Sequence, residues 1–140
     1  MPSLKGGCAC KAVRYEATAE PVVSGACYCR DCQYSSGGGP GYVIMMPRAG
    51  VTVTGETGTF WMQNTRGTRI GRDFCPSCGT PLFAHSAAAP DLVSIKPGSL
   101  DDPSLFKSQG SVWVASAQPW HLIDQGLPQW DGNPDGPPKG

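Results

Sequence analysis

The sequence has no long apolar run, only two histidines and no excess of charge of either sign. Lys plus Arg number 11 and Asp plus Glu also number 11, so no overall field attracts nucleic acid or an anionic membrane surface. No segment approaches the length of a transmembrane helix, and the first residues lack the apolar core of a signal peptide. We therefore expect a cytoplasmic protein with neither a nucleic-acid nor a membrane partner.

The chain is rich in residues that interrupt helices, with 19 Gly and 14 Pro among 140 residues. Long helices are therefore disfavoured, and short strands joined by tight turns are favoured. A hydrophobic content of 39% is sufficient for one core at this length. We predict a mostly-β single domain over residues 1–125, followed by a Gly- and Pro-rich surface tail over 126–140.

Short apolar or alternating runs bounded by turn residues predict the strands. These runs cover residues 12–17, 42–46, 51–54, 59–62, 68–74, 81–84, 92–95 and 112–115. Cys8 and Cys10, two positions apart, are expected on one face of the first strand. Residues 119–123 are expected to form one helical turn.

The seven cysteines are the most informative residues of the chain. An odd number fits poorly with a disulfide framework, and close pairs in a reducing compartment more often bind metal. Their spacing divides them into a group of three and two distant pairs that together supply four sulfurs. The three are Cys27, Cys29 and Cys32, and the four are Cys8, Cys10, Cys75 and Cys78.

The four-cysteine set predicts a closed tetrahedral zinc site that stabilises the fold. Cys75 and Cys78 flank a tight turn, and Gly79 is suited to the positive φ that directs amides toward thiolates. The alternative is a thioredoxin-like redox pair, which requires a helix beginning at the motif. The following Thr80 and Pro81 form a poor helix start, so zinc is favoured.

The three-cysteine set is one ligand short of a closed zinc site, as expected of a catalytic zinc with an open position. The formal charge of such a centre is 2 − 3 = −1, which suits capture of a thiol or a carbonyl oxygen. Arg30 lies inside this loop and is a candidate for gripping a substrate carboxylate. The glycine-rich residues 37–41 follow closely and are expected to wall the site.

Two other interpretations of the three-cysteine set remain open. An iron–sulfur cluster would usually take four cysteines. A second structural zinc would need a fourth protein ligand. The candidates for that ligand are His85, His121 and Asp31.

With these motifs in place, the chain resembles the glutathione-dependent formaldehyde-activating enzyme family, which includes the centromere-protein-V-like proteins. All seven cysteines fall in the order of the family. The resemblance extends over five segments: Gly7-Cys8-Ala9-Cys10 with Val13-Arg14-Tyr15, Cys27-Tyr28-Cys29-Arg30-Asp31-Cys32, Phe74-Cys75-Pro76-Ser77-Cys78-Gly79-Thr80, Gly98-Ser99-Leu100-Asp101-Asp102, and Pro119-Trp120.

The resemblance implies a zinc-bound, mostly-β fold of the Mss4-like or β-tent type. For the oligomeric state we expect a monomer or a homodimer. It implies two zinc ions per chain, a structural one on the four-cysteine set and a catalytic one on Cys27, Cys29 and Cys32. The implied activity is that of a carbon–sulfur lyase joining glutathione to formaldehyde as S-hydroxymethylglutathione, or a related thiol and aldehyde. The alternative is a non-catalytic, zinc-stabilised binding or scaffold domain.

Overall fold

The computed structural model describes residues 3–64 and 66–139, which form short strands and little helix. The strands are β1 (Leu4–Gly7), β2 (Arg14–Ala17), β3 (Val23–Cys27), β4 (Gly41–Pro47), β5 (Val51–Thr54), β6 (Gly58–Gln63), β7 (Arg69–Phe74), β8 (Pro81–Ser86), β9 (Leu92–Ile95) and β10 (Ser111–Val112). The helical elements are α1 (Arg30–Ser36) and the 3-10 turns η1 (Arg48–Gly50), η2 (Pro97–Ser99), η3 (Pro103–Leu105) and η4 (Val114–Ser116). The prediction of a mostly-β protein is confirmed.

The chain divides into two compact units. Unit 1 comprises the residues up to Val23 together with Ile44–Phe106, and unit 2 comprises Ser24–Val43 together with the residues from Lys107 onward. Each unit contains one complete cysteine cluster. The predicted boundary between residues 125 and 126 stays a prediction.

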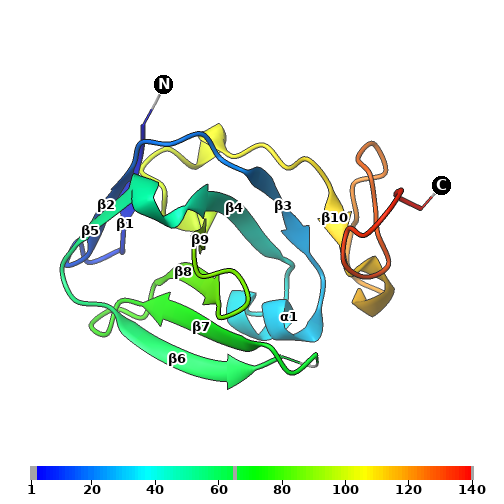
Figure 1. Cartoon of the computed structure of the whole chain (residues 1–140), viewed down its shortest axis with the longest axis horizontal. Coiled ribbons are helices and arrows are strands. Elements are labelled where there is room, and N and C mark those ends of the chain that lie inside the picture. Colours follow the sequence, from blue (N-terminus) through cyan, green and yellow to red (C-terminus); the bar gives the residue numbers. More distant parts are fainter. Residues whose placement is uncertain (1–2, 65, 140) are drawn as a thin grey trace. The chain divides into compact units, whose positions relative to one another are not determined.

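Unit 1 is built from antiparallel strands (Figure 1). One sheet has the order β1-β2-β5, with Tyr15 opposite both Gly6 and Val53. The strands of the other run in the order β4-β9-β8-β7-β6. Most of the apolar runs in the sequence correspond to these strands, because each run has the length of one strand and ends at a turn residue.

The hydrophobic core of unit 1 is a single cluster with members from both sheets. Its buried residues are Cys8, Val13, Tyr15, Ala17, Ile44, Met46, Cys75, Leu82, Phe83, Val93, Ile95 and Leu100. Two cysteines of the four-cysteine set are therefore core residues. Burial of this apolar surface holds the turns that carry them in place.

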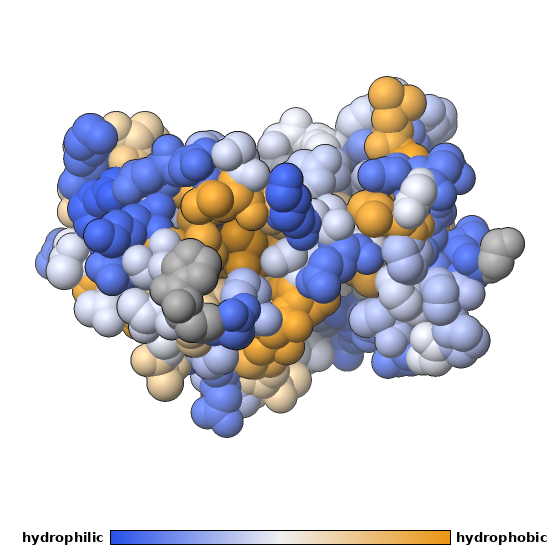
Figure 2. Space-filling model, turned by 90° about the horizontal axis from the view of Figure 1, so that it is seen from above, coloured by the Kyte–Doolittle hydropathy of each residue, from blue (hydrophilic) through white to orange (hydrophobic). Residues whose placement is uncertain are grey.

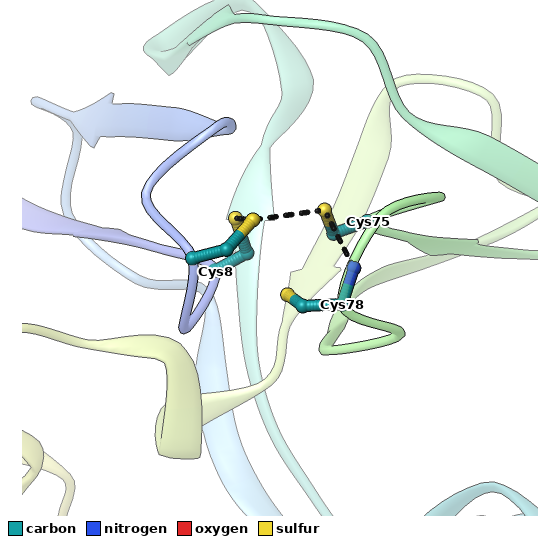
Figure 3. A group of neighbouring side chains, drawn as sticks. Cys8, Cys75 and Cys78 are labelled. Atoms are coloured by element: carbon teal, nitrogen blue, oxygen red, sulfur yellow. Dashed lines mark hydrogen bonds between the residues drawn. The ribbon is translucent and has the colours of Figure 1, made fainter.

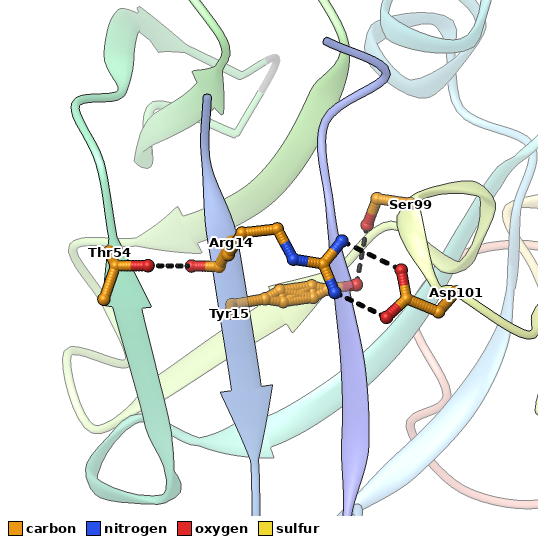
Figure 4. A network of polar contacts seen from close by, with 5 residues as sticks. All are labelled: Arg14, Tyr15, Thr54, Ser99 and Asp101. Carbon is orange, nitrogen blue, oxygen red and sulfur yellow. Dashed lines mark hydrogen bonds and ion pairs between the residues drawn. The ribbon is translucent and has the colours of Figure 1, made fainter. Parts of the chain in front are cut away.

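Two of the segments that carry the family resemblance contact each other in unit 1 (Figure 4). The buried Tyr15 hydroxyl lies 2.7 Å from Ser99 Oγ, and the Arg14 guanidinium donates to the Asp101 carboxylate at 2.9 Å. Burial raises the pKa of Tyr15 to about 12. These residues attach β2 to the segment after β9, so their role here is structural.

Unit 2 has few regular elements. Strands β3 and β10 pair in parallel, with Val112 opposite Cys27. Helix α1 follows β3, capped by Cys29 at its start and by the left-handed Gly37 at its end. Near the C-terminus, Gln129 bridges to Ser111 of β10 and to Lys139.

The structure corrects three local predictions. Cys8 and Cys10 lie in a turn after β1, with Lys11 at φ 68° and its amide bonded to the Cys8 carbonyl, rather than on a strand. Strand β10 ends at Val112, because the left-handed Trp113 begins the turn η4. Residues 119–123 form no helix in the described structure.

Polar and charged residues cover much of the surface shown in Figure 2, with apolar residues between them. The large exposed apolar side chains include Tyr34, Phe60, Trp120 and Leu122. None of the described helices is long and apolar enough to cross a membrane.

Candidate metal centres

Unit 1 brings four cysteine sulfurs together from two turns (Figure 3). Cys8 and Cys10 come from the turn before β2, and Cys75 and Cys78 from the turn after β7. All four sulfurs lie within 4.8 Å of one another, with Cys10 3.6 Å from Cys8 and 3.7 Å from Cys75. Cys8 and Cys75 are buried, whereas Cys10 and Cys78 are exposed.

Backbone amides surround the buried sulfurs of this cluster. The Val13 amide donates to Cys8 Sγ at 3.2 Å, and the amides of Ser77 and Cys78 donate to Cys75 Sγ at 3.4 and 3.5 Å. Gly79 has φ 78°, as predicted from its place after the turn. Such amides compensate the negative charge of thiolates.

The surroundings of Cys78 favour its thiolate form. The hydroxyl of Thr80, 3.1 Å from Cys78 Sγ, and the Thr80 amide lower the pKa of Cys78 to about 5. Four sulfurs with this support fit the closed set of a structural zinc, whose ligands must be thiolates.

Unit 2 brings the other three sulfurs together around the start of α1. Cys27 ends β3, Cys29 caps the helix and Cys32 lies in its first turn. Their sulfurs lie within 4.8 Å of one another, and all three side chains are half-buried. The sequence did not predict that a helix begins inside this loop.

Two of the three thiols have pKa values shifted in opposite directions by their neighbours. Cys27 and Cys32, together with the amides of Cys32 and Asp31, lower the pKa of Cys29 to about 2. Cys29 first, then Cys32 and burial, raise the pKa of Cys27 strongly. The surroundings stabilise one thiolate and destabilise a second one next to it. A cation such as Zn²⁺ would offset this repulsion, so the cluster suits a metal ion.

No His, Asp or Glu completes this group of sulfurs in the described part of the chain. The ring of His121 is fully engaged: Nδ1 accepts the Gln118 amide at 2.8 Å, and Nε2 donates to the Gly38 carbonyl at 2.7 Å. His85 belongs to unit 1 and lies 3.0 Å from Asp73. The candidate ligands Asp31, His85 and His121 therefore lie outside the three-sulfur group.

A buried glutamine, which sequence reasoning missed, organises the surroundings of the three-cysteine cluster. The Gln33 Oε1 atom accepts from Arg30 at 2.6 Å and from Gln118 at 3.1 Å. Its Nε2 donates to the carbonyls of Tyr28 at 2.8 Å and Ser116 at 3.0 Å. Every hydrogen-bonding position of the amide is used, so Gln33 fixes both the cysteine loop and Arg30.

Arg30 itself is exposed at the start of α1, where its guanidinium also lies 4.8 Å from the Tyr34 ring. A guanidinium held in this way keeps further donors for a carboxylate. The spacing of Arg30 and Gln33, three positions apart, would have indicated their contact if the helix had been recognised.

Within the glycine-rich residues 37–41, Gly41 lies against Cys32 of the three-cysteine cluster. A side chain at Gly41 would place its Cβ 2.8 Å from Cys32 Sγ, so glycine is required by close approach. At the other end of the segment, the Gly38 carbonyl is held by His121. The contacts of Gly38 and Gly41 thus fix two positions of this segment, and its role as a wall of the site stays a prediction.

The family model described as "Glutathione-dependent formaldehyde-activating enzyme" matches residues 3–116, a range that includes both cysteine clusters. The chain belongs to this family. A Halomonas elongata protein provisionally named a glutathione-dependent formaldehyde-activating enzyme is 29% identical over 103 residues. That alignment covers 64% of the present chain and 60% of the Halomonas protein, so the chain spans less than two thirds of this relative.

A crystal structure of a Rhodobacter sphaeroides protein has a similar fold. It matches with a TM-score of 0.56 and 18% identity over 90% of the present chain and 98% of that protein. At this identity the likeness concerns the fold alone. The description of the family names a thiol, glutathione, and the two clusters bring cysteine sulfurs together.

Proposed function

We propose that the protein is a zinc-dependent carbon–sulfur lyase acting on the adduct of a small-molecule thiol and a small aldehyde. Glutathione and formaldehyde are the first pair to test, because they occur in the name of the family. The observation that carries the proposal is the three-sulfur group of Cys27, Cys29 and Cys32, which no described His, Asp or Glu completes.

Each cysteine cluster has its own role in this proposal. Cys8, Cys10, Cys75 and Cys78 would hold a structural zinc in unit 1, and Cys27, Cys29 and Cys32 a catalytic zinc in unit 2. A zinc ion with an open position stabilises a thiolate near neutral pH and polarises a carbonyl. The chain supplies the surroundings in which this chemistry is directed at one substrate.

The reaction is an addition in which no atom is lost. The thiol sulfur provides the electron pair of the new carbon–sulfur bond, the carbonyl π electrons move to oxygen, and the thiol proton ends on that oxygen. Arg30, held by Gln33, binds a substrate carboxylate and thereby orients the thiol. The wall of residues 37–41 limits the space for the aldehyde.

The test is the rate at which ¹³C-labelled formaldehyde exchanges with S-hydroxymethylglutathione, measured by exchange NMR with zinc-loaded protein. The reaction proceeds without catalyst, so the quantity of interest is the excess rate per mole of protein. We expect an excess for the parent and its loss for Cys29→Ser. The variant Gln125→Leu, at an exposed position of the same unit, keeps all seven cysteines and should retain the excess.

This function would be refuted if Cys29→Ser catalysed the exchange at the parental rate while its fold and its four-cysteine zinc were intact. No excess rate for the parent with any small thiol and aldehyde would also refute it. The second result would favour the binding or scaffold role instead.

A further inference from the structure

Unit 1 contains a cavity that the thiol chemistry does not use. Its volume is about 130 Å³. The apolar part of its lining comes from Val51 and Val53 of β5, Phe83 of β8 and Val93 of β9. The polar part includes Asp73 of β7 and Arg48. The cavity therefore combines an aliphatic and aromatic wall with one acidic and one basic residue.

Asp73 is a well-positioned carboxylate. Its Oδ1 accepts the Thr59 hydroxyl at 2.7 Å and lies 3.0 Å from His85 Nε2, and its side chain is only 16% exposed. Its other oxygen, Oδ2, has no hydrogen-bond partner in the described parts of the chain. The carboxylate is thus held by one oxygen and can offer the other to a donor in the cavity.

The histidine behind Asp73 is itself fixed. The Trp61 ring meets His85 edge-on, with centroids 5.0 Å apart. A Cβ at Gly71, between them in the sheet, would lie 2.4 Å from the His85 ring, so only glycine leaves room for this arrangement. The orientation of Asp73 is therefore set by packing as well as by hydrogen bonds.

Arg48 is anchored through only part of its guanidinium. Its Nε donates to the Pro90 carbonyl at 3.0 Å. Its terminal Nη atoms have no partner among the residues that the structure describes, and the side chain is exposed. These donors are available to a carboxylate in the geometry that arginine favours.

We propose that this cavity binds a small zwitterion with an apolar body, the chemical class of the aliphatic α-amino acids. The ammonium group donates to Asp73, the carboxylate accepts from Arg48, and the side chain packs against the valines. A simple amine would be repelled by the like charge of Arg48. A simple carboxylate would be repelled by the like charge of Asp73. A zwitterion satisfies both residues.

The size of the cavity agrees with this class. At roughly 10–15 Å³ for each group the size of a water molecule, the volume accommodates a ligand of about ten non-hydrogen atoms. Leucine, with four of its carbons in the side chain, is therefore a suitable first probe. The site is composed entirely of unit 1 residues, so it can be tested independently of the proposed lyase activity.

The experiment is a titration of the zinc-loaded, full-length protein with L-leucine, followed by amide and methyl NMR shifts. We expect saturable shifts at the valines of the cavity, with a dissociation constant on the order of 1 mM. Leucinol, which lacks the carboxylate, and 4-methylpentanoate, which lacks the ammonium group, should each bind about tenfold more weakly. Glycine, which lacks the apolar body, should also bind more weakly.

Two variants test the site from different sides. Asp73→Asn removes the charge and should weaken leucine binding by about tenfold or more. Val53→Phe fills the cavity from its exposed wall, so it should block binding without disturbing the core. Asp91→Asn makes the same charge change at an exposed residue outside the cavity and should bind leucine like the parent.

The proposal is overturned if leucine causes no saturable shift at the cavity. It is also overturned if leucinol and 4-methylpentanoate bind as tightly as leucine, or if Val53→Phe binds like the parent. None of these readouts depends on aldehyde or glutathione.

Discussion

The two cysteine clusters contain similarly spaced thiols but have different surroundings. In unit 1, two of the four cysteines are members of the hydrophobic core, and three backbone amides donate to their sulfurs. In unit 2, all three cysteines are half-buried and border a network of polar side chains centred on Gln33. The first arrangement suits a structural ion with a closed set of protein ligands. The second suits an ion with one position open to an exchangeable ligand.

The difference shows that ligand spacing and ligand environment carry separate information. Two residues separate the cysteines in each of two pairs, Cys75–Cys78 and Cys29–Cys32. Only the first pair is joined by a second pair from a distant turn. The number of sulfurs decides whether a site can be closed. Burial and the neighbouring polar groups decide what a site that stays open can accept.

The largest expected effect is the loss of the buried ligand in unit 1. Cys75→Ser should leave the protein unfolded or aggregated, because a structural zinc contributes roughly 10 kcal/mol of apparent binding energy in small domains. Circular dichroism and zinc content measure the outcome. Cys29→Ser, the matched change in unit 2, should remain folded with its four-cysteine zinc, and equal damage from both would remove the distinction between the clusters.

The next largest effect concerns the polar network of unit 2. Gln33→Leu leaves the carbonyls of Tyr28 and Ser116 without this donor. The loss costs about 1–3 kcal/mol for the buried Tyr28 contact and less for the half-buried Ser116 contact. Hydrogen exchange should accelerate in α1 and spare the strands of unit 1. Gln125→Leu, an exposed glutamine in the same unit, is the control. Uniform acceleration through both units would mean that the network is not local to the site.

A smaller effect is expected where the glycine wall touches the cysteines. Gly41→Ala places a methyl group against Cys32 Sγ. Such overpacking forces neighbouring atoms to shift and typically costs about 1–3 kcal/mol. Here the shift would affect both the glycine segment and the position of the Cys32 sulfur. The affinity of the three-cysteine cluster for zinc should fall, as measured by competition with a chromophoric chelator. Gly39→Ala has nothing closer than 4.0 Å and should bind zinc like the parent. Identical affinities for the two variants would contradict the close approach.

The smallest effect is expected at the exposed ion pair of unit 1. Asp101→Asn weakens its contact with Arg14, but both side chains are substantially exposed, at 51% and 38%, so water and salt screen the interaction. The melting temperature at neutral pH should change less than in the other variants. A loss approaching that of Cys75→Ser would show that the pair, rather than the metal cluster, secures this part of unit 1.

Features that depend on neighbouring residues could be predicted from the sequence. The strands from Gly41 to Ile95 follow from short apolar runs, and the separation of the cysteines into four and three follows from their spacing. The positive φ of Gly79 follows from its place after a tight turn. In each case the cause lies within a few residues of its effect.

The remaining features depend on distant contacts. Gln33 acquires its importance from Ser116 and Gln118, which lie 83 and 85 positions away, and a polar residue on a short helix gives no sign of this. Cys8 and Cys10, two positions apart, also fit β alternation, so their spacing alone predicts a strand where the structure has a turn. In the structure this turn brings both sulfurs to those of the distant Cys75 and Cys78.

The most direct test of the central claim uses protein in which Co²⁺ replaces zinc, because cobalt–thiolate sites absorb light according to their ligands. If the three-cysteine cluster is an open centre for a thiol substrate, addition of glutathione should increase the sulfur-to-cobalt charge-transfer absorption. Cys29→Ser, folded and with its four-cysteine site loaded, should show no increase. A parental spectrum that is indifferent to glutathione and to every other small thiol, with both clusters loaded, would contradict the account.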